Sequence, residues 1–400
     1  MPFPAVAPDL RAARVGVFGI FGINGFLLAM WVVHIPAITD RTGVSKSALG
    51  LPILLLAAGA VVGMQLAGPL ADRYGSRIMV GLGAVIVSAS LIGPGLAGSP
   101  AQLGIALFVL GFGNGGLDVS MNAQAVYVER AYERPIMSAF HAFFSCGGVA
   151  GALLGAATLH AGWDIRVSLG LAAVLSLALT AVFTPRLLPH VRPVHAQEKG
   201  AVAKGGRTPA RVWALGGVAF AVLLCEGVAN DWSALQVKEH LDASDATAAL
   251  AFGAFSTMMT LGRFGADRVA GALGPVAIVR YGTLIAGVGM LFVVTSDWVA
   301  LTLFGWGLFG LGLSGAVPQI FTAAGNLNAQ SAGVNMSRVF SMGYLAFLAG
   351  PSLIGALTKV MPLTTAMLVP LAGVLFAAVA ANVVETTSSA QPERAARSTD

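Results

Sequence analysis

Long apolar stretches, separated by short polar segments, run along the whole chain. Each holds about 20 mostly apolar residues, the length that an α-helix needs to cross the hydrocarbon core of a bilayer. Twelve such stretches can be distinguished: Val15–Ile38, Ala48–Leu70, Ile78–Leu96, Leu103–Val128, Met137–Leu159, Val167–Leu187, Val212–Leu235, Ala246–Phe264, Val276–Thr295, Val299–Ala323, Val339–Leu357 and Leu363–Val383. The pattern predicts an all-α membrane protein with twelve transmembrane helices.

The composition supports this class and excludes others. Of the 400 residues, 56% are hydrophobic and 10% are charged, whereas about a quarter of a soluble chain is charged. Cys146 and Cys225 both lie in apolar stretches, so the sequence has no disulfide framework and no zinc spacing. It also lacks Walker A, zinc-protease and nucleophile-elbow motifs, so we expect neither a cofactor nor a metal, and no enzyme activity.

A polar, basic segment divides the twelve stretches into two sets of six. Residues 189–210 contain Pro, Gly, Lys and Arg and few large apolar side chains, which is typical of a flexible linker. We therefore expect an N-terminal six-helix half at 1–188, a cytoplasmic linker at 189–210, a C-terminal half at 211–385 and a disordered tail at 386–400.

The positions of Lys and Arg predict how the chain lies in the membrane. Leaving out Arg280, seventeen lie in the termini, the linker and the loops of one side, and five lie in loops of the other side. Because basic loops remain in the cytoplasm, we expect both termini on the cytoplasmic side of the cytoplasmic membrane. This topology explains the net charge of +5 better than nucleic-acid binding does.

The two halves repeat each other at an offset of roughly 195–200 residues, a spacing typical of transporters built from repeats. Ala-Asp-Arg follows the second span at Asp72 and recurs after the eighth span at Asp267. Glycines of the fourth span recur in the tenth, where Gly111, Gly113 and Gly116 match Gly310, Gly312 and Gly315. Because these motifs and glycines repeat at about the same offset, the sequence predicts two similar helical bundles.

The fourth span carries the most unusual polar residues. Asn114, Asp118 and Asn122 recur every fourth residue, so a helix places them on one face. A carboxylate at the centre of a membrane helix costs about 2.5–3.5 kcal/mol on insertion scales and usually faces a cavity. These residues therefore predict one wall of a polar binding site.

Other polar residues of the spans could extend this site. Glu226 and Asn230 share a face of the seventh span, and Asp231 lies nearer its extracellular end. We expect Asp118, Glu226 and Asp231 to serve proton coupling. The predicted substrate-binding set is Asn24, Asn114, Asp118, Asn122, His141, Glu226, Asn230 and Gln319. A structural role remains open for each, because buried polar groups also join membrane helices to one another.

The segment from Gly68 to Arg77, GPLADRYGSR, resembles the signature between the second and third spans of the major facilitator superfamily. The resemblance implies a rocker-switch transporter with one central cavity. It also implies that Asp72 holds a cytoplasmic gate closed against the start of the eleventh span, where Arg338 is a candidate partner. The predicted gate residues are Asp72, Arg73, Arg77, Asp267, Arg268 and Arg338. The alternative is a solvated loop pair of little energetic value.

The run Gly-Gly-Leu-Asp118-x-x-x-Asn122 resembles the fucose-permease-like branch of that family, which carries Glu in place of Asp. The proton-coupled sugar permease of that branch also has an aspartate in its first span, and Val32 stands there in this chain. The full proton relay therefore does not carry over. Drug antiporters usually have an arginine in the fourth span, which has none here before Arg130.

We expect a monomeric secondary transporter that moves a small polar solute together with protons across the lipid bilayer. A sugar-like molecule is one candidate for this solute. The alternative is proton-driven efflux of amphipathic or cationic compounds, which cavity carboxylates would attract. A membrane-embedded enzyme or a sensor is a third reading. The sequence shows neither a catalytic set at one depth nor a sizeable soluble domain.

Overall fold

The computed structural model describes residues 8–44, 50–189, 209–328 and 331–385. Most of the predicted linker and the whole tail lie outside these residues. The helices are α1 (Pro8–Thr42), α2 (Gly50–Tyr74), α3 (Ser76–Ser90), α4 (Ile92–Leu96), α5 (Pro100–Tyr132), α6 (Met137–His160), α7 (Ile165–Phe183), α8 (Ala210–Leu241), α9 (Asp245–Leu273), α10 (Pro275–Thr295), α11 (Val299–Leu313), α12 (Ala316–Asn326), α13 (Ala332–Leu357), α14 (Leu363–Ala366) and α15 (Leu368–Val379). Short 3₁₀ turns at Thr184–Arg186 and Ala380–Val384 follow α7 and α15. No strand occurs in the described part of the chain, and most of its helices are long and apolar enough to span a membrane, in agreement with the predicted all-α membrane fold.

Eleven segments of the described chain are long and apolar enough to cross a membrane, judged by length and composition. The helix α9 is not among them, although it occupies the place of the predicted eighth span. It continues to Leu273, beyond the predicted end at Phe264, and so takes Asp267 and Arg268 into its helical part.

Three predicted spans are each divided into two helices, and a proline explains each division. The breaks follow Ser90, Leu313 and Ala366. Pro94, Pro318 and Pro370 lie four residues after Ser90, Ser314 and Ala366, respectively. Proline has no N–H to bond the carbonyl four residues earlier, and its ring collides with that carbonyl. The helix therefore ends there and restarts.

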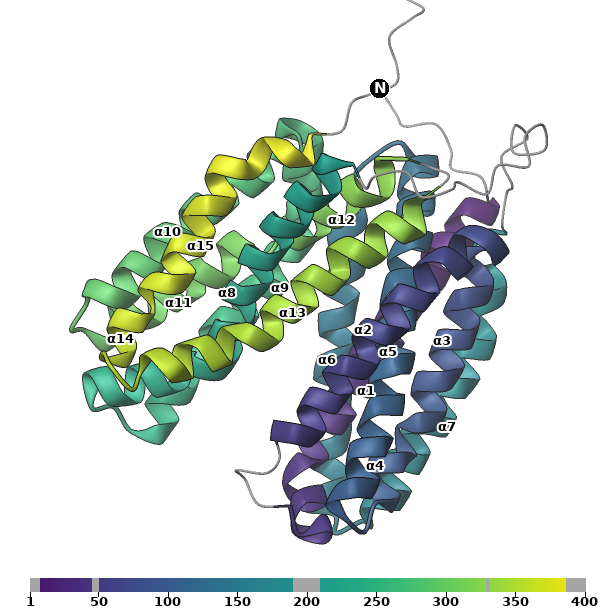
Figure 1. Cartoon of the computed structure of the whole chain (residues 1–400), viewed down its shortest axis with the longest axis horizontal. Helices are drawn as coiled ribbons and strands as arrows, with labels where there is room; N and C mark the ends of the chain where they lie inside the picture. Colours follow the sequence, from purple (N-terminus) through teal and green to yellow (C-terminus); the bar gives the residue numbers. More distant parts are fainter. Residues whose placement is uncertain (1–7, 45–49, 190–208, 329–330, 386–400) are drawn as a thin grey trace, which may run out of the picture.

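The helices form two groups, which Figure 1 shows as two bundles inclined to each other. We call α1–α7 the N-bundle and α8–α15 the C-bundle. In the N-bundle, α1 packs on α6, and α2 and α3 pack on α5. In the C-bundle, α8 packs on α13, and α9 and α10 pack on α11. These are equivalent pairs under the sequence repeat.

Repeated glycines permit this close packing in both bundles. A Cβ added at Gly111 of α5 would overlap the carbonyl oxygen of Leu56 in α2. A Cβ added at Gly310 of α11 would overlap the carbonyl oxygen of Phe255 in α9. The two glycines matched in the sequence thus have the same role, because only a residue without a side chain lets the backbones approach so closely.

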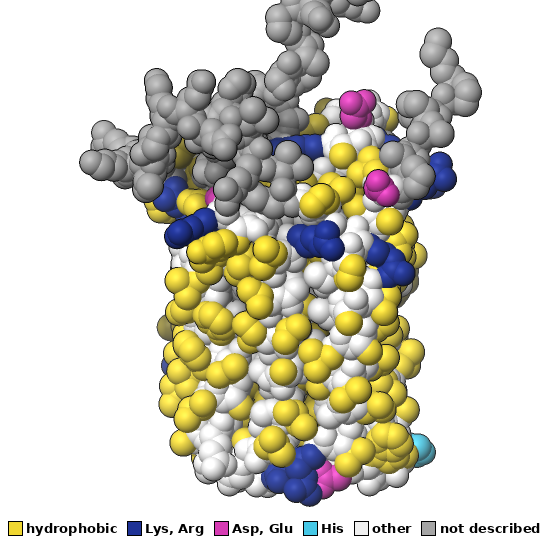
Figure 2. Space-filling view, turned by 90° about the vertical axis from the view of Figure 1, so that its right-hand side faces the viewer, with side chains coloured by type: hydrophobic (Ala, Val, Ile, Leu, Met, Phe, Trp, Pro, Cys, Tyr) yellow, Lys and Arg dark blue, Asp and Glu magenta, His cyan; other side chains and the backbone are white. Residues whose placement is uncertain are grey.

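The two bundles meet at one end of the molecule and separate toward the other (Figure 1). We call the end at which α1 begins and α15 ends the terminus side, and the opposite end the far side. The α2–α13 and α6–α9 pairs make the most extensive contacts between the bundles. One lateral face is covered by hydrophobic side chains over most of its height, and Lys and Arg are concentrated near its two ends (Figure 2).

Candidate functional site

On the terminus side, Asp72 joins the two bundles. This residue near the end of α2 accepts hydrogen bonds from the backbone N–H groups of Gly333 at 2.8 Å and Val334 at 3.0 Å. Both donors lie in the first turn of α13, where the unpaired N–H groups and the helix dipole favour a negative charge. Arg338 lies further along α13, and its pairing with Asp72 stays a prediction.

Asp267 makes the equivalent contact from the other bundle. Near the end of α9, it accepts hydrogen bonds from the backbone N–H groups of Ser138 at 2.8 Å and Ala139 at 2.7 Å. These donors lie in the first turn of α6. The repeat therefore produces two matching contacts, each between a carboxylate of one bundle and a helix N-terminus of the other. Among the other predicted gate residues, Arg73 and Arg268 are exposed and Arg77 is half-buried.

The sequence reasoning missed a further contact on the same side. Glu129, near the end of α5, accepts hydrogen bonds from the Ile136 and Met137 N–H groups and from the Thr322 hydroxyl at 2.7 Å. The neighbouring Arg130 donates to the side chain of Asn326 and to the carbonyl oxygen of Gly325. An acidic residue at the end of an apolar span was the available signal. Its partners in α12 could not be deduced from spacing.

Asp118 lies near the middle of α5, about 27 Å along the helix from Pro100. The side-chain amide of Asn122 donates to the Asp118 carboxylate at 3.2 Å. One turn toward the far side, the Asn114 amide donates to the Tyr344 hydroxyl of α13 at 2.8 Å. Tyr344 is also within electrostatic reach of Asp118. The fourth-span residues thus lie on one face, where a residue of the C-bundle approaches them.

Several buried amide groups have unpaired polar atoms. Asn24, Asn114 and Asn122 each have a buried Oδ1 atom without a hydrogen-bond partner, and Gln319 has such an Nε2 atom. Buried polar atoms are normally hydrogen-bonded, to the protein or to water. These atoms could therefore accept from and donate to a polar solute or ordered water.

A second polar cluster joins α6, α8 and α9. Arg263 of α9 is 8% exposed and lies 3.6 Å from the Glu226 carboxylate of α8. It also donates to the Ser145 hydroxyl of α6 at 2.8 Å, and His141 is within its electrostatic reach. The sequence predicted Arg263 near the end of the eighth span but gave it no role. The structure places it at the contact between the bundles.

The remaining predicted site residues are less closely connected. The His141 ring packs against Phe21 and Phe321, and its Nδ1 atom lies 3.1 Å from the Met137 carbonyl oxygen. In α8, Asn230 is half-buried and Asp231 is exposed. Within the described residues, no group of three or more His, Cys, Asp or Glu side chains could hold a metal ion.

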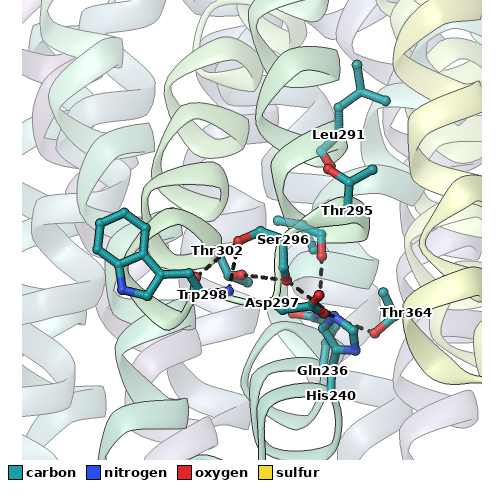
Figure 3. Close-up of polar contacts among 10 residues, drawn as sticks. Gln236, His240, Leu291, Thr295, Ser296, Asp297, Trp298, Thr302 and Thr364 are labelled. Atoms are coloured by element: carbon teal, nitrogen blue, oxygen red, sulfur yellow. Dashed lines mark hydrogen bonds and ion pairs between the residues drawn. The ribbon is translucent and has the colours of Figure 1, made fainter.

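Near the far side, a buried network links helices within the C-bundle (Figure 3). Gln236 of α8 donates to the Val293 carbonyl oxygen and the Thr364 hydroxyl, and accepts from the Trp306 indole N–H at 3.2 Å. His240, one turn later, lies 3.3 Å from the Ser296 carbonyl oxygen and 3.6 Å from Asp297. The partners shown for Gln236 and His240 among the described residues all belong to the C-bundle, so this network holds one bundle together.

The chain is similar to known membrane transporters along most of its length. The model of the Major Facilitator Superfamily matches residues 17–235. An uncharacterised MFS-type transporter of Yersinia pestis is 32% identical over 90% of this chain and 93% of its own length. The membrane protein MosC of Rhizobium meliloti is 30% identical over 96% of this chain and 93% of its own length.

Solved structures agree at the level of the fold. A crystal structure of the transporter FucP in the outward conformation has a TM-score of 0.79 to this chain, with 14% sequence identity. The match covers 93% of this chain and 98% of that one. Another structure of that protein names it as the E. coli fucose:proton symporter. The family match, the long relatives and the shared fold agree, and this chain belongs to the major facilitator superfamily of multi-pass membrane transporters.

Proposed function

We propose that this chain is a proton-coupled secondary transporter that carries a small, polar, sugar-like solute by alternating access between the N- and C-bundles. The observation that carries the proposal is the environment of Asp118. This carboxylate lies in mid-span beside Asn122, and no cationic side chain forms an ion pair with it in the described part of the chain. A charge held there is expensive, so binding a proton relieves a real cost.

The surroundings of Glu226 support a different role for it. Its carboxylate lies 3.6 Å from the Arg263 guanidinium, which is itself buried. Glu226 thus has an ion-pair partner, whereas no cationic side chain forms an ion pair with Asp118 in the described part of the chain. We assign Asp118 the coupling role and the Glu226–Arg263 pair a role in holding the bundles, with Asp231 as a candidate proton entry group because it is exposed.

The contacts between the bundles support an outward-facing state, with the termini in the cytoplasm. The hydrogen bonds that the structure shows between the bundles include those of Asp72 and Asp267 on the terminus side and, at mid-depth, the one between Asn114 and Tyr344. The bundles separate toward the far side (Figure 1). The Asp72 and Asp267 contacts then act as the closed cytoplasmic gate. In alternating access the two six-helix halves would rock about mid-depth and close the far side.

The unpaired amide atoms support a hydroxyl-rich solute. Asn24, Asn114, Asn122 and Gln319 offer acceptors and a donor without partners, and a sugar supplies several hydroxyl groups that both donate and accept. A polar site of this kind rejects solutes that leave its groups unpaired. The neighbouring FucP structures concern a fucose:proton symporter, which adds to this choice of solute class.

The test uses purified protein in liposomes that contain a pH-sensitive dye, with neutral monosaccharides, L-fucose included, added outside. We expect sugar-dependent proton entry with wild type and none with Asp118→Asn. Asp118→Glu should restore it in part, because the ionisable group is kept. Unchanged proton entry with Asp118→Asn would refute the coupling role, and absence of proton entry with every sugar would refute the solute class.

The Asp118 carboxylate, which has no ion-pair partner among the described residues, also suits a cationic solute, so proton-driven efflux remains the second candidate function. Fluorescent cation accumulation in cells with and without the protein separates the two. Efflux predicts lower accumulation in cells that contain wild type, and Asp118→Asn should abolish the difference. Sugar symport predicts no difference between these cells.

A further inference from the structure

Tyr344 of α13 approaches the Asp118 carboxylate from the other bundle. Its hydroxyl oxygen accepts the Asn114 side-chain N–H at 2.8 Å, and Asp118 is within electrostatic reach of it. Asn114 and Asp118 are four residues apart on α5, so they lie on one face of that helix. Asp118 and Tyr344 are both half-buried. A hydroxyl group of the C-bundle thus lies close to the N-bundle carboxylate to which we assign the coupling role.

The Tyr344 hydroxyl keeps its own proton for donation. Its oxygen accepts from Asn114, and among the described residues no acceptor is shown for its O–H group. A phenol both donates and accepts, an ionised carboxylate only accepts, and a protonated carboxyl has an O–H group of its own. The O–H group of Tyr344 is therefore complementary to the ionised form of Asp118. It is much less complementary to the protonated form, which carries no charge.

A second hydroxyl of α13 makes a comparable contact with the N-bundle. Ser341 precedes Tyr344 by three residues, and its hydroxyl accepts the Gln65 side-chain N–H of α2 at 2.6 Å. Neither Gln65 nor Ser341 changes its charge with pH. Two neighbouring hydroxyl groups therefore join α13 to the N-bundle, one through a neutral amide alone and one within reach of an ionisable carboxyl.

Other charged or titratable groups on the helices packed against α5 and α13 must be separated from Asp118. Those closest to the middle of each helix are Arg14 and His34 of α1, Asp72 of α2, Arg77 of α3, Tyr127 of α5, His141 and Cys146 of α6, Cys225, Glu226 and Asp231 of α8, and Arg338 of α13. The helices α4, α12 and α14 have none. Because some of these groups also titrate, a variant of Asp118 is needed to identify the group that responds to pH.

We propose that Tyr344 links the protonation of Asp118 to the position of the C-bundle. While Asp118 is ionised, its charge attracts the Tyr344 hydroxyl and holds α13 against α5, as in the outward-facing state. When Asp118 binds a proton, the charge and this attraction are lost, so α13 can move and the far side closes. Tyr344 is a positioning residue, because it acts through Asp118 and keeps its own proton. The inference rests on the coupling role proposed for Asp118, but not on the solute.

The test measures the distance between spin labels at Ala161 and Lys359, exposed far-side positions of the two bundles, at mildly alkaline and mildly acidic pH without solute. For wild type, we expect acidic pH to raise the ratio of short to long distances roughly tenfold, the effect of losing one hydrogen bond to a charged group. Tyr344→Phe keeps the ring and should lose this response. Ser341→Ala is the matched control, which removes the neighbouring hydroxyl and should keep the response.

Asp118→Asn separates this inference from the proposed function. If Asp118→Asn abolishes the pH response and Tyr344→Phe keeps it in full, Asp118 acts without Tyr344, and the link alone is wrong. If Asp118→Asn keeps the response, another group responds to pH, and the coupling role is wrong as well. Equal loss in Ser341→Ala would also overturn the link, because any weakened contact of α13 would then have the same effect.

A second variant covers the case in which Tyr344→Phe does not fold. Asn114→Leu/Tyr344→Phe replaces both partners of the hydrogen bond by apolar groups, so no amide N–H is left without its acceptor. It should lose the pH response as Tyr344→Phe does. A response equal to that of wild type in this double variant would overturn the link.

Discussion

Replacing Asp72 by Asn tests whether the carboxylate contacts hold the terminus side closed. Asn has the same shape but keeps one acceptor oxygen and places an NH₂ group where Asp72 accepted the second N–H. A hydrogen bond to a charged group contributes about 1.5–3 kcal/mol, and the helix dipole adds about 0.3–1 kcal/mol. Losing one such bond and the charge should cost the closed state about 2 kcal/mol, which is roughly a 30-fold shift of the open–closed equilibrium.

The repeat supplies a second, independent measurement of the same effect. Asp267 makes two equivalent hydrogen bonds to the start of α6, of 2.8 and 2.7 Å. The two contacts share no residue, so their free energies should add. Asp267→Asn should therefore match Asp72→Asn, and the double variant should shift the equilibrium by about 4 kcal/mol, roughly 1000-fold.

Spin labels on the far side report the shift. Ala161 follows α6 and Lys359 follows α13, so the two exposed positions lie in different bundles and approach each other when the far side closes. In a background without Cys146 and Cys225, we expect one long distance for wild type and a growing short component in the single and double variants. Pulsed electron–electron double resonance measures the distribution of distances between the two labels, and so reports the long and the short component.

Asp164→Asn is the control. The Arg166 guanidinium, 2.6 Å away, holds the pKa of the exposed Asp164 carboxyl below its usual range. This pair lies on the far side within the N-bundle and should leave the distances unchanged. An unaltered distribution in the Asp72→Asn/Asp267→Asn double variant, or an equal shift with Asp164→Asn, would show that the carboxylate contacts do not hold the closed state.

Two further predictions concern stability. Glu226→Gln should lower the free energy of unfolding by about 3–5 kcal/mol, because it leaves the Arg263 guanidinium buried without a carboxylate. Glu226→Gln/Arg263→Met should recover much of that loss in thermal unfolding, and a double variant as unstable as the single one contradicts the explanation. Gln236→Leu should lower the free energy of unfolding by about 2–4 kcal/mol, because it leaves the Trp306 N–H and the Val293 carbonyl without their partner. An unchanged Tm would show that water replaces the amide.

The fold could be predicted because each span is long and apolar by itself, but the breaks within spans could not. Pro94, Pro318 and Pro370 each end a helix four residues earlier, whereas α1 and α2 continue through Pro36 and Pro69. The same residue type has both outcomes because neighbouring helices can satisfy the freed carbonyl. That depends on packing, which hydropathy does not contain.

The site was predictable only within single helices. Asn114, Asp118 and Asn122 share a face because a helix repeats every 3.6 residues. The Tyr344 hydroxyl accepts a hydrogen bond from the Asn114 side-chain amide. The two residues are 230 positions apart in the chain, and no local pattern connects them. The partners of Arg263 could not be predicted for the same reason. The predicted span stopped at Phe264, one residue after Arg263, but α9 continues to Leu273, and Arg263 is paired with Glu226 inside the protein.

The repeat itself separates structural groups from candidate chemical ones. Residues that the fold itself needs are expected in both bundles. Asp72 is matched in this way by Asp267, and Gly111 by Gly310. Asp118 has no such counterpart, because Val317 occupies the matching position of the C-bundle and is buried among apolar residues. The C-bundle thus folds without a carboxylate at the matching position. The fold therefore does not require the costly buried charge of Asp118 in α5, and this favours a role of Asp118 in binding or coupling at the interface.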